Sequence, residues 1–351
     1  MIRAAIVGLS WIGADPAGPP SGDVLGTAVP YSHASALAAV PEVTVVAGCD
    51  LSAGAREAFQ ERWSGRWPGL RTYDDTARML AEQRPDLVAI ATPDHLHVPV
   101  ALAAMDAGAR MLFCEKPVAV DLADADRLVA AAERTGTTVN VNYTRRWLPD
   151  FVEARERVRA GDIGPLGQVI SLTGGPRAML FRNLTHTLDL LCYFADDDPL
   201  WTVAELEPGF EEYGTAYRGD GGRDPATEPG GYAHVVFRNG VRGYLSGAKA
   251  LPAGEALQLL GATGRIVIDV EGARIITAGP DGALVRRLTP RFTRSGMAAA
   301  VADLVASHRA GRPPASPPRD ARRSVALTDA ILRSQAQGNV RVPVEPDRSD
   351  P

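Results

Sequence analysis

The sequence has few cysteines, and they lie far apart. Cys49, Cys114 and Cys192 form no C-x-x-C pair, so there is no zinc or redox motif, and an odd, sparse count fits a reducing compartment. No apolar stretch approaches the ~18–20 residues that a membrane-spanning helix needs. Residues 1–10 lack the long apolar region of a signal peptide. We therefore expect a soluble, cytoplasmic protein that does not bind membranes.

Basic residues are not in surplus either. Lys and Arg total 37 against 42 Asp and Glu, which gives a formal net charge of −5. Because phosphate backbones attract a surplus of basic charge, this balance excludes nucleic acid as a partner. His95 and His97 have no third metal ligand nearby, so we predict no metal site. A small anionic ligand in a locally basic pocket is still compatible with this charge.

The length of 351 residues suggests two domains. Through the first 145 residues, short apolar runs alternate with helical stretches that Ser52, Asp74 and Asp121 are placed to cap. This alternation predicts a parallel, doubly wound sheet with helices on both faces, which is a Rossmann-type dinucleotide-binding domain over residues 1–145. The expected strands are 2–7, 43–48, 86–91, 110–114 and 138–142, with helices near 31–40, 52–63, 74–84, 97–107 and 121–136.

The second half has a different pattern, which predicts an α+β domain over residues 146–342. Residues 231–287 contain several strand-like runs without helices between them, and Asn239-Gly240 is a strong two-residue hairpin signal. We therefore expect an open, mostly antiparallel sheet, with the last helix packing back on the first domain. Residues 343–351 are polar and are expected to fray. The other expected elements are a strand at 166–173 and helices near 149–160, 184–194, 295–309 and 319–337.

The first predicted strand ends in a sequence that approximates the dinucleotide fingerprint G-x-G-x-x-G. Gly8, Ser10 and Gly13 occupy the three glycine places, with Trp11 and Ile12 between the last two. The fingerprint requires a tight turn and a close approach of the backbone to a pyrophosphate, and Ser10 departs from it with a small side chain. The helix that should follow is delayed by an enlarged loop over residues 14–30. Taken alone, the pattern fits a plain turn equally well.

Asp50 follows the second predicted strand, where a carboxylate can accept hydrogen bonds from both hydroxyls of an adenosine ribose. A carboxylate there repels a 2′-phosphate, so Asp50 favours NAD over NADP as the cofactor. The alternative is that Asp50 only caps the helix that begins after it.

Two further strand ends are predicted to meet at the carboxyl edge of the sheet, where ligands bind in such folds. They carry Thr92-Pro93 and Glu115-Lys116-Pro117. A lysine at this place can hydrogen-bond a substrate oxygen and stabilise developing negative charge. The alternative is a surface lysine paired with Glu115.

The pattern T-P-x-x-x-H, about a dozen helical residues and then A-G-x-x-x-x-x-C-E-K-P resembles the Gfo/Idh/MocA oxidoreductase family of glucose–fructose oxidoreductase and inositol dehydrogenases. The similarity extends over nearly the whole chain, including the segments 141–175, 185–194, 237–248 and 320–338. It implies reversible hydride transfer between a nicotinamide and a carbinol carbon, usually of a sugar or polyol. It also implies a homo-oligomer, a dimer or tetramer formed through the second sheet.

The same resemblance assigns roles to individual residues. Lys116 and His186 match the catalytic lysine and histidine of the family, and His97 matches a histidine near the cofactor. Lys116-Pro117 is expected to be a cis peptide, as in relatives. Asp189 lies three residues after His186 and therefore on the same helix face, from which it could orient the imidazole.

Arg182 departs from the family pattern, because many members carry Asp four residues before the catalytic histidine. Three interpretations are open. His186 acts without a carboxylate, with Asn183 supplying a polar contact; Arg182 binds a carboxylate or phosphate on the substrate; or the activity is altered or lost. After the last strand of the first domain, Tyr143, Arg145, Arg146 and Trp147 either line the substrate pocket or pack between the domains.

The sequence thus predicts an NAD-dependent dehydrogenase or reductase that acts on the CH–OH group of a sugar, polyol or sugar derivative, with an acidic or nucleotide-linked substrate as one possibility. Two alternatives are an NAD-dependent glycosidase that oxidises its substrate transiently and a cofactor-binding regulator without turnover.

Overall fold

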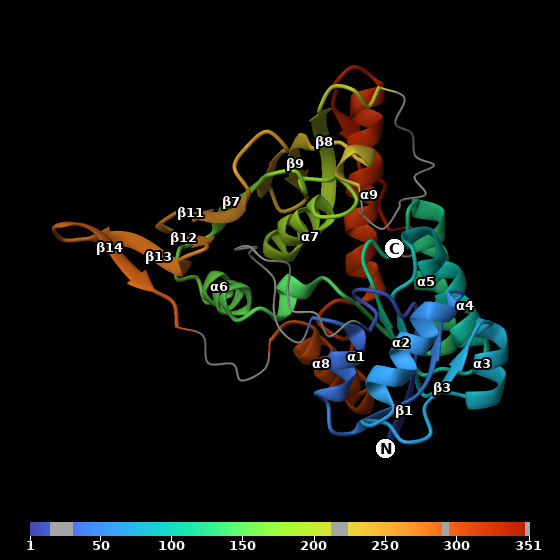
Figure 1. Cartoon of the computed structure of the whole chain (residues 1–351). Coiled ribbons are helices and arrows are strands. Elements are labelled where there is room, and N and C mark those ends of the chain that lie inside the picture. Colours follow the sequence, from blue (N-terminus) through green and yellow to red (C-terminus); the bar gives the residue numbers. More distant parts are fainter. Residues whose placement is uncertain (15–30, 212–223, 290–294, 348–351) are drawn as a thin grey trace.

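The computed structural model describes residues 1–14, 31–211, 224–289 and 295–347. Its first sheet is six-stranded and entirely parallel, with the strand order β3-β2-β1-β4-β5-β6 (Figure 1). This order reverses direction between β1 and β4, as in a doubly wound fold, and confirms the predicted fold class. The strands are β1 (Ile2–Val7), β2 (Val43–Cys49), β3 (Arg71–Tyr73), β4 (Leu87–Ile90), β5 (Met111–Cys114) and β6 (Thr138–Val141).

Helices cover both faces of this sheet, because successive strand residues point to opposite sides and both sides are apolar. One face packs against α1 (His33–Ala38), α2 (Ala53–Trp63) and α8 (Gly296–Ala310). The other face packs against α3 (Thr76–Gln83), α4 (His97–Asp106), α5 (Leu122–Thr135) and part of α9 (Pro318–Ala336). The chain therefore returns to the first sheet with its last two helices.

The second sheet has nine strands in the order β14-β13-β12-β11-β7-β10-β9-β8-β15. Only β7 and β10 pair in parallel, so the expectation of a mostly antiparallel sheet is confirmed. The strands are β7 (Leu166–Gly174), β8 (Pro199–Leu206), β9 (Gly231–Phe237), β10 (Arg242–Ala248), β11 (Gly254–Gly261), β12 (Gly264–Asp269), β13 (Gly272–Gly279), β14 (Gly282–Arg287) and β15 (Val342–Pro343).

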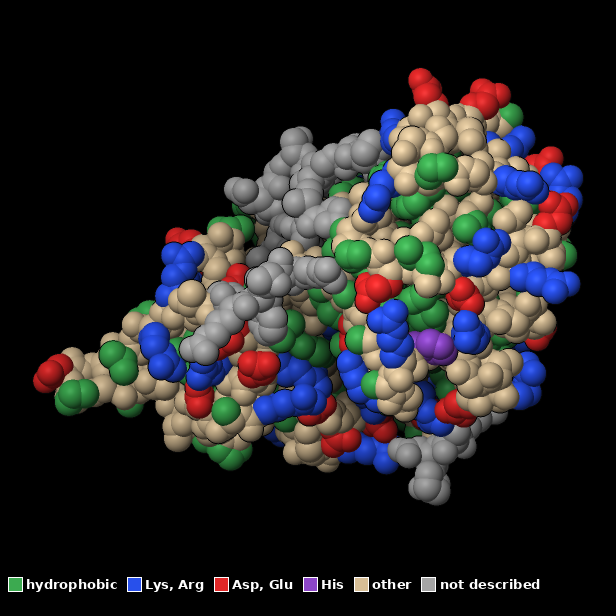
Figure 2. Space-filling model, turned by 90° about the horizontal axis from the view of Figure 1, so that it is seen from below, with side chains coloured by type: hydrophobic (Ala, Val, Ile, Leu, Met, Phe, Trp, Pro, Cys, Tyr) green, Lys and Arg blue, Asp and Glu red, His purple; other side chains and the backbone are tan. Residues whose placement is uncertain are grey.

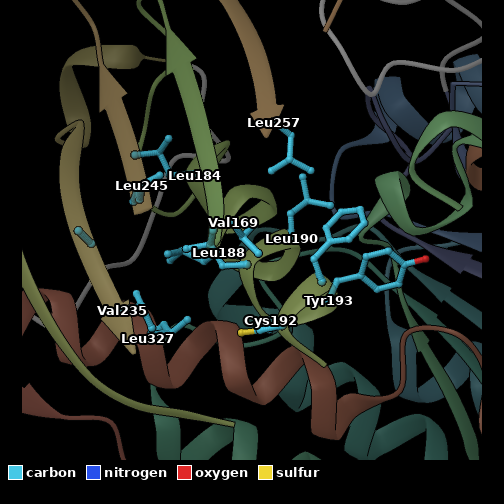
Figure 3. Packing of buried hydrophobic residues seen from close by; sticks show 14 of the residues in the cluster. Val169, Leu184, Leu188, Leu190, Cys192, Tyr193, Val235, Leu245, Leu257 and Leu327 are labelled. Carbon is cyan, nitrogen blue, oxygen red and sulfur yellow. The ribbon is translucent and has the colours of Figure 1, made fainter. Parts of the chain in front are cut away.

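One face of the second sheet packs on α6 (Pro149–Arg159), α7 (Leu184–Ala195) and α9. Helix α7 lies between the sheet and α9, and leucines along it meet apolar residues of both (Figure 3). Because α7 is buried on nearly all sides, it is a rigid support for any polar side chain that it carries. On the opposite face of the sheet, Leu172 and Tyr232 are 41 % and 45 % exposed.

The predicted hairpin at Asn239-Gly240 joins β9 and β10, which pair antiparallel. Gly240 adopts φ 85°, and the Asn239 side chain accepts a hydrogen bond from the Val241 N–H at 3.1 Å. A second hairpin, β13–β14, projects from the far end of the sheet, away from the first domain (Figure 1).

Three local expectations were wrong. Asp75, not Asp74, caps α3, because its side chain accepts the Arg78 N–H. Strands β3 and β8 were not predicted from the sequence. The stretch after Val342 is not frayed up to residue 347: Pro343 pairs with β8, the Val344 N–H bonds to the Leu200 carbonyl, and Asp347 binds Arg319.

The surface in Figure 2 carries acidic and basic side chains side by side, without a broad field of one sign. Among the described residues, no helix is long and apolar enough to cross a membrane.

A buried ion cluster ties the segment that follows β6 to α7 and α9. Arg146 lies in the short helix η2 (Thr144–Trp147) that follows β6. Its guanidinium donates two hydrogen bonds to Asp189 of α7, from Nε at 2.9 Å and Nη2 at 2.7 Å, and a third to Asp320 of α9 at 2.6 Å. Arg146 and Asp189 are both buried, so removal of Arg146 leaves Asp189 uncompensated, and removal of Asp189 leaves Arg146 with Asp320 as its one carboxylate partner among the described residues.

We expect Asp189→Ala to lower the free energy of unfolding by about 3–5 kcal/mol, because the buried Arg146 would lose its bidentate partner. The matched control is Glu133→Ala, which breaks the half-exposed α5–α9 ion pair with Arg319 and should cost under about 1 kcal/mol. Urea denaturation followed by circular dichroism measures both. Equal effects of the two substitutions would contradict this assignment.

Candidate active site

The fingerprint turn between β1 and α1 requires glycine at two places. Gly8 has φ 92°, and a Cβ atom there would lie 2.4 Å from the Ala91 carbonyl oxygen. A Cβ atom on Gly13 would lie 2.0 Å from the carbonyl oxygen of Gly8. The Gly13 N–H closes the turn on the Ser10 carbonyl at 3.0 Å. The pattern therefore forms the tight turn that the fingerprint demands.

Helix α1 follows this turn in space although it is delayed in sequence. The N–H groups of His33 and Ala34 donate to the carbonyls of Ile12 and Gly13, at 2.8 and 3.0 Å. The insertion therefore leaves the strand–turn–helix contact intact. Most of the enlarged loop, residues 15–30, lies outside the described residues.

Asp50 lies beside the fingerprint turn. Its Oδ2 accepts the Leu9 N–H at 2.8 Å, and its Oδ1 accepts the Ser52 N–H at 2.9 Å. The side chain that caps α2 belongs to Ser52, so the helix-cap alternative for Asp50 is wrong. Trp11, within the same turn, has φ 51° and is 54 % exposed.

Glu115, at the end of β5, is a buried carboxylate held by two partners that the sequence did not reveal. Its Oε1 bonds to His33 Nε2 at 2.9 Å and accepts from Asn142 Nδ2 at 2.5 Å. Burial alone would raise the pKa of Glu115, but the hydrogen bond and charge of His33, the charge of Lys116 and the Asn142 bond lower it to about 2. Glu115 is therefore ionised at neutral pH.

Lys116 is the next residue and is 7 % exposed, so the surface-lysine alternative is wrong. Its Nζ crosses between the two domains and donates to the Arg182 carbonyl oxygen at 2.7 Å. Burial and the nearby positive charge of Arg182 lower the pKa of Lys116 to about 7, against the opposing effect of Glu115. Both protonation states are therefore accessible near neutral pH. The Lys116-Pro117 peptide bond is cis, as expected.

His186 lies in the first turn of α7, close enough to Lys116 to be affected by its charge. Burial first, and then the positive charges of Arg145, Lys116 and Arg182, hold the pKa of His186 well below its ordinary value. The imidazole is therefore neutral at pH 7. Its ring meets the Tyr143 ring edge-on, with 5.8 Å between the centroids.

Asp189 does not orient His186, contrary to the expectation from helical spacing. Both carboxylate oxygens of Asp189 are engaged by Arg146, and the His186 Nδ1 atom has no hydrogen-bond partner among the described residues. Tyr143 is also fully buried, with its hydroxyl 3.1 Å from Thr185 Oγ1. Tyr143, Arg146 and Asp189 thus support the site from behind instead of lining an open pocket.

The segment before α7 brings Arg182 and Asn183 to the same place. The carboxylate of Glu228 accepts the Arg182 N–H at 3.1 Å, while the Asn183 carbonyl accepts the His186 N–H at 3.0 Å. The Arg182 guanidinium reaches across to the first domain, where Nη1 lies 3.6 Å from Oδ1 of the buried Asp94. No sequence signal identified Asp94 or Glu228 as part of this region.

His97 connects the loops that follow β4 and β5. Its Nδ1 lies 2.7 Å from the Pro117 carbonyl oxygen and its Nε2 lies 2.9 Å from that of Thr92. It is buried, whereas His95 is exposed, so the two histidines do not converge. Within the described residues, no group of three or more His, Cys, Asp or Glu could hold a metal ion.

Buried polar atoms without partners gather at this edge. The described residues include ten such side-chain atoms, and five of them belong to this site. Because a buried polar group without a partner costs free energy, their concentration here indicates a ligand that supplies the partners. The amide and hydroxyl groups of a nicotinamide riboside are of the chemistry required. The five atoms are His33 Nδ1, Thr92 Oγ1, Asp94 Oδ2, Asn142 Oδ1 and His186 Nδ1.

Comparisons with known proteins show what the chain is similar to. A family model described as "Oxidoreductase family, NAD-binding Rossmann fold" matches residues 2–143. Inositol 2-dehydrogenase of Salmonella typhimurium is 28 % identical over 207 residues, which are 56 % of this chain and 55 % of that protein. D-apiose dehydrogenase of Paraburkholderia graminis is 34 % identical over 134 residues, 38 % of this chain and 34 % of that protein. The chain thus spans about half or less of the length of these curated relatives.

Two solved structures share the whole fold. An aldose-aldose oxidoreductase of Caulobacter crescentus has a TM-score of 0.76 at 20 % identity and covers 97 % of this chain and 99 % of its own. The WlbA dehydrogenase of Bordetella pertussis, in complex with NADH and UDP-GlcNAcA, has a TM-score of 0.72 at 21 % identity, with 99 % of each chain covered.

We expect Lys116 to titrate near pH 7, because burial and Arg182 disfavour its ammonium form. The chain has only two lysines, Lys116 and Lys249, so ¹³C-methylation of lysines followed by NMR resolves them. Lys116→Met should remove the signal that titrates near pH 7. A Lys116 signal that titrates near ~10.4, the ordinary lysine value, would contradict the buried environment.

Proposed function

We propose that this chain, whose residues 2–143 match the model of the oxidoreductase family with the NAD-binding Rossmann fold, transfers a hydride between NAD and the CH–OH carbon of a sugar, polyol or sugar derivative. One observation carries the proposal: Lys116 from the first domain and His186 from the second converge at the strand ends where buried polar atoms without partners gather. Catalysis of alcohol oxidation needs a proton acceptor and a polar contact for the oxygen at one point.

The cofactor would lie along the carboxyl edge of the first sheet. The turn over Gly8, Ser10, Trp11, Ile12 and Gly13 would hold the pyrophosphate, since its glycines allow the close backbone approach. The adenosine ribose would bind Asp50, whose charge disfavours the 2′-phosphate of NADP. The nicotinamide half would lie near Thr92, Pro93, Glu115 and Lys116, with His97 supporting their loops from behind. When bound, NAD accepts or supplies the hydride.

Lys116 and His186 would both contact the substrate oxygen, with different roles. The resemblance matches His186 to the catalytic histidine of the family, but its depressed pKa makes it a weak proton acceptor. Lys116, with a pKa of about 7, is better matched to that role. We assign the proton transfer to the Lys116 amine and the orientation of the oxygen to the neutral His186. To act, the Lys116 Nζ must exchange the Arg182 carbonyl for the substrate.

The proposal also includes a homo-oligomer formed through the exposed face of the second sheet. Trp201, His234 and Tyr244 form an aromatic row across β8, β9 and β10, with centroid separations of 5.1 and 4.9 Å. The exposed Leu172 and Tyr232 lie on the same face, and aromatic and aliphatic side chains of this kind are typical of interfaces. A cytoplasmic location is supported by three free cysteines, all buried.

The function is tested by incubating the protein with sugars, polyols, uronates and nucleotide-sugars, with NAD and NADP in parallel, and following the absorbance of reduced nicotinamide. We expect turnover with NAD in preference to NADP. The kcat/KM of oxidation should rise as the pH increases through about 7, the pKa of Lys116, because the neutral amine accepts the proton. Lys116→Met should lower kcat/KM by about 10²–10⁴-fold.

The control variant is His95→Ala, which removes an exposed histidine of the loop after β4 and should leave turnover unchanged. Sugar release without accumulation of NADH would replace the dehydrogenase with the glycosidase alternative. NAD binding without turnover of any compound would favour the regulator.

We expect light scattering to give a dimer or tetramer of the 37.2 kDa chain. Tyr232→Glu should dissociate it, because a charge would replace an aromatic side chain within the proposed interface. Leu284→Glu, on the exposed β14 arm, is the matched control and should leave the mass unchanged. A wild-type mass of one chain would contradict the interface.

A further inference from the structure

We propose that Arg182 forms an oxyanion subsite, so that the substrate is a sugar derivative carrying a carboxylate or a phosphate group. This inference rests on the proposed function, because it concerns the substrate of the same crevice. It specifies which group on that substrate binds which side chain.

The Arg182 backbone is fixed on both sides. Its N–H donates to the Glu228 carboxylate and its carbonyl accepts from Lys116 Nζ. The position from which the side chain extends is therefore set by the two domains together. The side chain is 17 % exposed, so it is mostly buried but not sealed from solvent.

The guanidinium itself has few partners. Among the described residues it makes no side-chain hydrogen bond, and its one ionic contact is the 3.6 Å approach to Asp94. The neighbouring arginines differ: Arg145 is held by both oxygens of Glu255, and Arg146 by both oxygens of Asp189. Arg182 therefore retains the planar array of donors that binds carboxylate or phosphate with two parallel bonds.

Asp94 is the carboxylate that an anionic substrate group would replace as the partner of Arg182. It is 2 % exposed, and its Oδ2 has no partner, so it attracts Arg182 without satisfying it. An oxyanion on the substrate offers Arg182 direct hydrogen bonds, which are stronger than a 3.6 Å contact. Asp94 then competes with the substrate for Arg182.

Tyr31 reports the positive charge around Arg182. Tyr31, where the chain returns from the inserted loop, is half-buried; burial and Glu115 raise its pKa, while Arg182 and Arg177 act in the opposite direction. Arg182 and Arg177 therefore both lie close enough to Tyr31 to act on it electrostatically. The positive charge of Arg182 at this place favours a group of full negative charge over a neutral hydroxyl.

The experiment titrates the NADH-bound full-length chain by calorimetry with glucuronate, galacturonate, the 6-phosphates of the two parent sugars, and glucose and galactose as neutral probes. Wild type should bind at least one oxyanion sugar more tightly than its neutral counterpart. Arg182→Ala should reduce that preference by about 10- to 100-fold, and Arg182→Lys should lie between, because it keeps the charge and loses the fork. The carboxylate and phosphate arms distinguish the two sources of the oxyanion.

Two further variants separate this role from a structural one. Asp94→Asn should strengthen oxyanion binding by about two- to fivefold, because a competing charge is removed. Arg78→Ala, which removes an exposed arginine of α3, should leave the preference unchanged. An unchanged preference in Arg182→Ala, no oxyanion preference in wild type, or equal weakening by Asp94→Asn and Arg182→Ala would overturn the subsite.

This outcome is separate from that of the dehydrogenase proposal. Oxyanion binding that depends on Arg182 but gives no NADH with NAD would support the subsite and contradict the reaction. Turnover of neutral sugars, with a preference that Arg182→Ala does not change, would support the reaction and contradict the subsite.

Discussion

A buried carboxylate and a buried amine stand next to each other at the end of β5, and the rest of the site depends on how their charges are held. Glu115 remains ionised because His33 and Asn142 bond to it from two neighbouring elements. Lys116 receives less compensation and loses part of its affinity for the proton. The same sheet edge thus presents a fixed negative charge and, beside it, a base that is active near neutral pH.

Much of this could be predicted from local sequence. Apolar periodicity located most helices and strands, and the glycine spacing and Lys116 pointed to the carboxyl edge of the first sheet as the candidate site. Partners distant in sequence could not be predicted in this way. Helical spacing placed Asp189 on the same face as His186, but in the folded chain both carboxylate oxygens of Asp189 accept hydrogen bonds from Arg146. His33 reaches Glu115 because the start of α1 is hydrogen-bonded to the fingerprint turn, although residues 15–30 separate the two in the sequence. Strand β8 was not predicted either.

The charges in the crevice are distributed differently from the pattern that the family resemblance implied. Where many relatives place a carboxylate four residues before the histidine, this chain has Arg182, and a carboxylate lies opposite it on the first domain at Asp94. In this chain the positive charge of the pair thus lies on the second domain and the negative charge on the first. Arg182 also lowers the pKa of Lys116. The residue that departs from the family pattern therefore helps Lys116 to act as a base near neutral pH.

The central claim is that NAD binds along the strand ends with its nicotinamide between Lys116 and His186. A crystal structure of the protein grown with NADH tests this most directly. The account predicts pyrophosphate density at the Gly8–Gly13 turn, ribose density at Asp50 and the nicotinamide beside Thr92 and Glu115, with the polar atoms there newly hydrogen-bonded. NADH bound elsewhere, or with its nicotinamide directed away from Lys116, would contradict it.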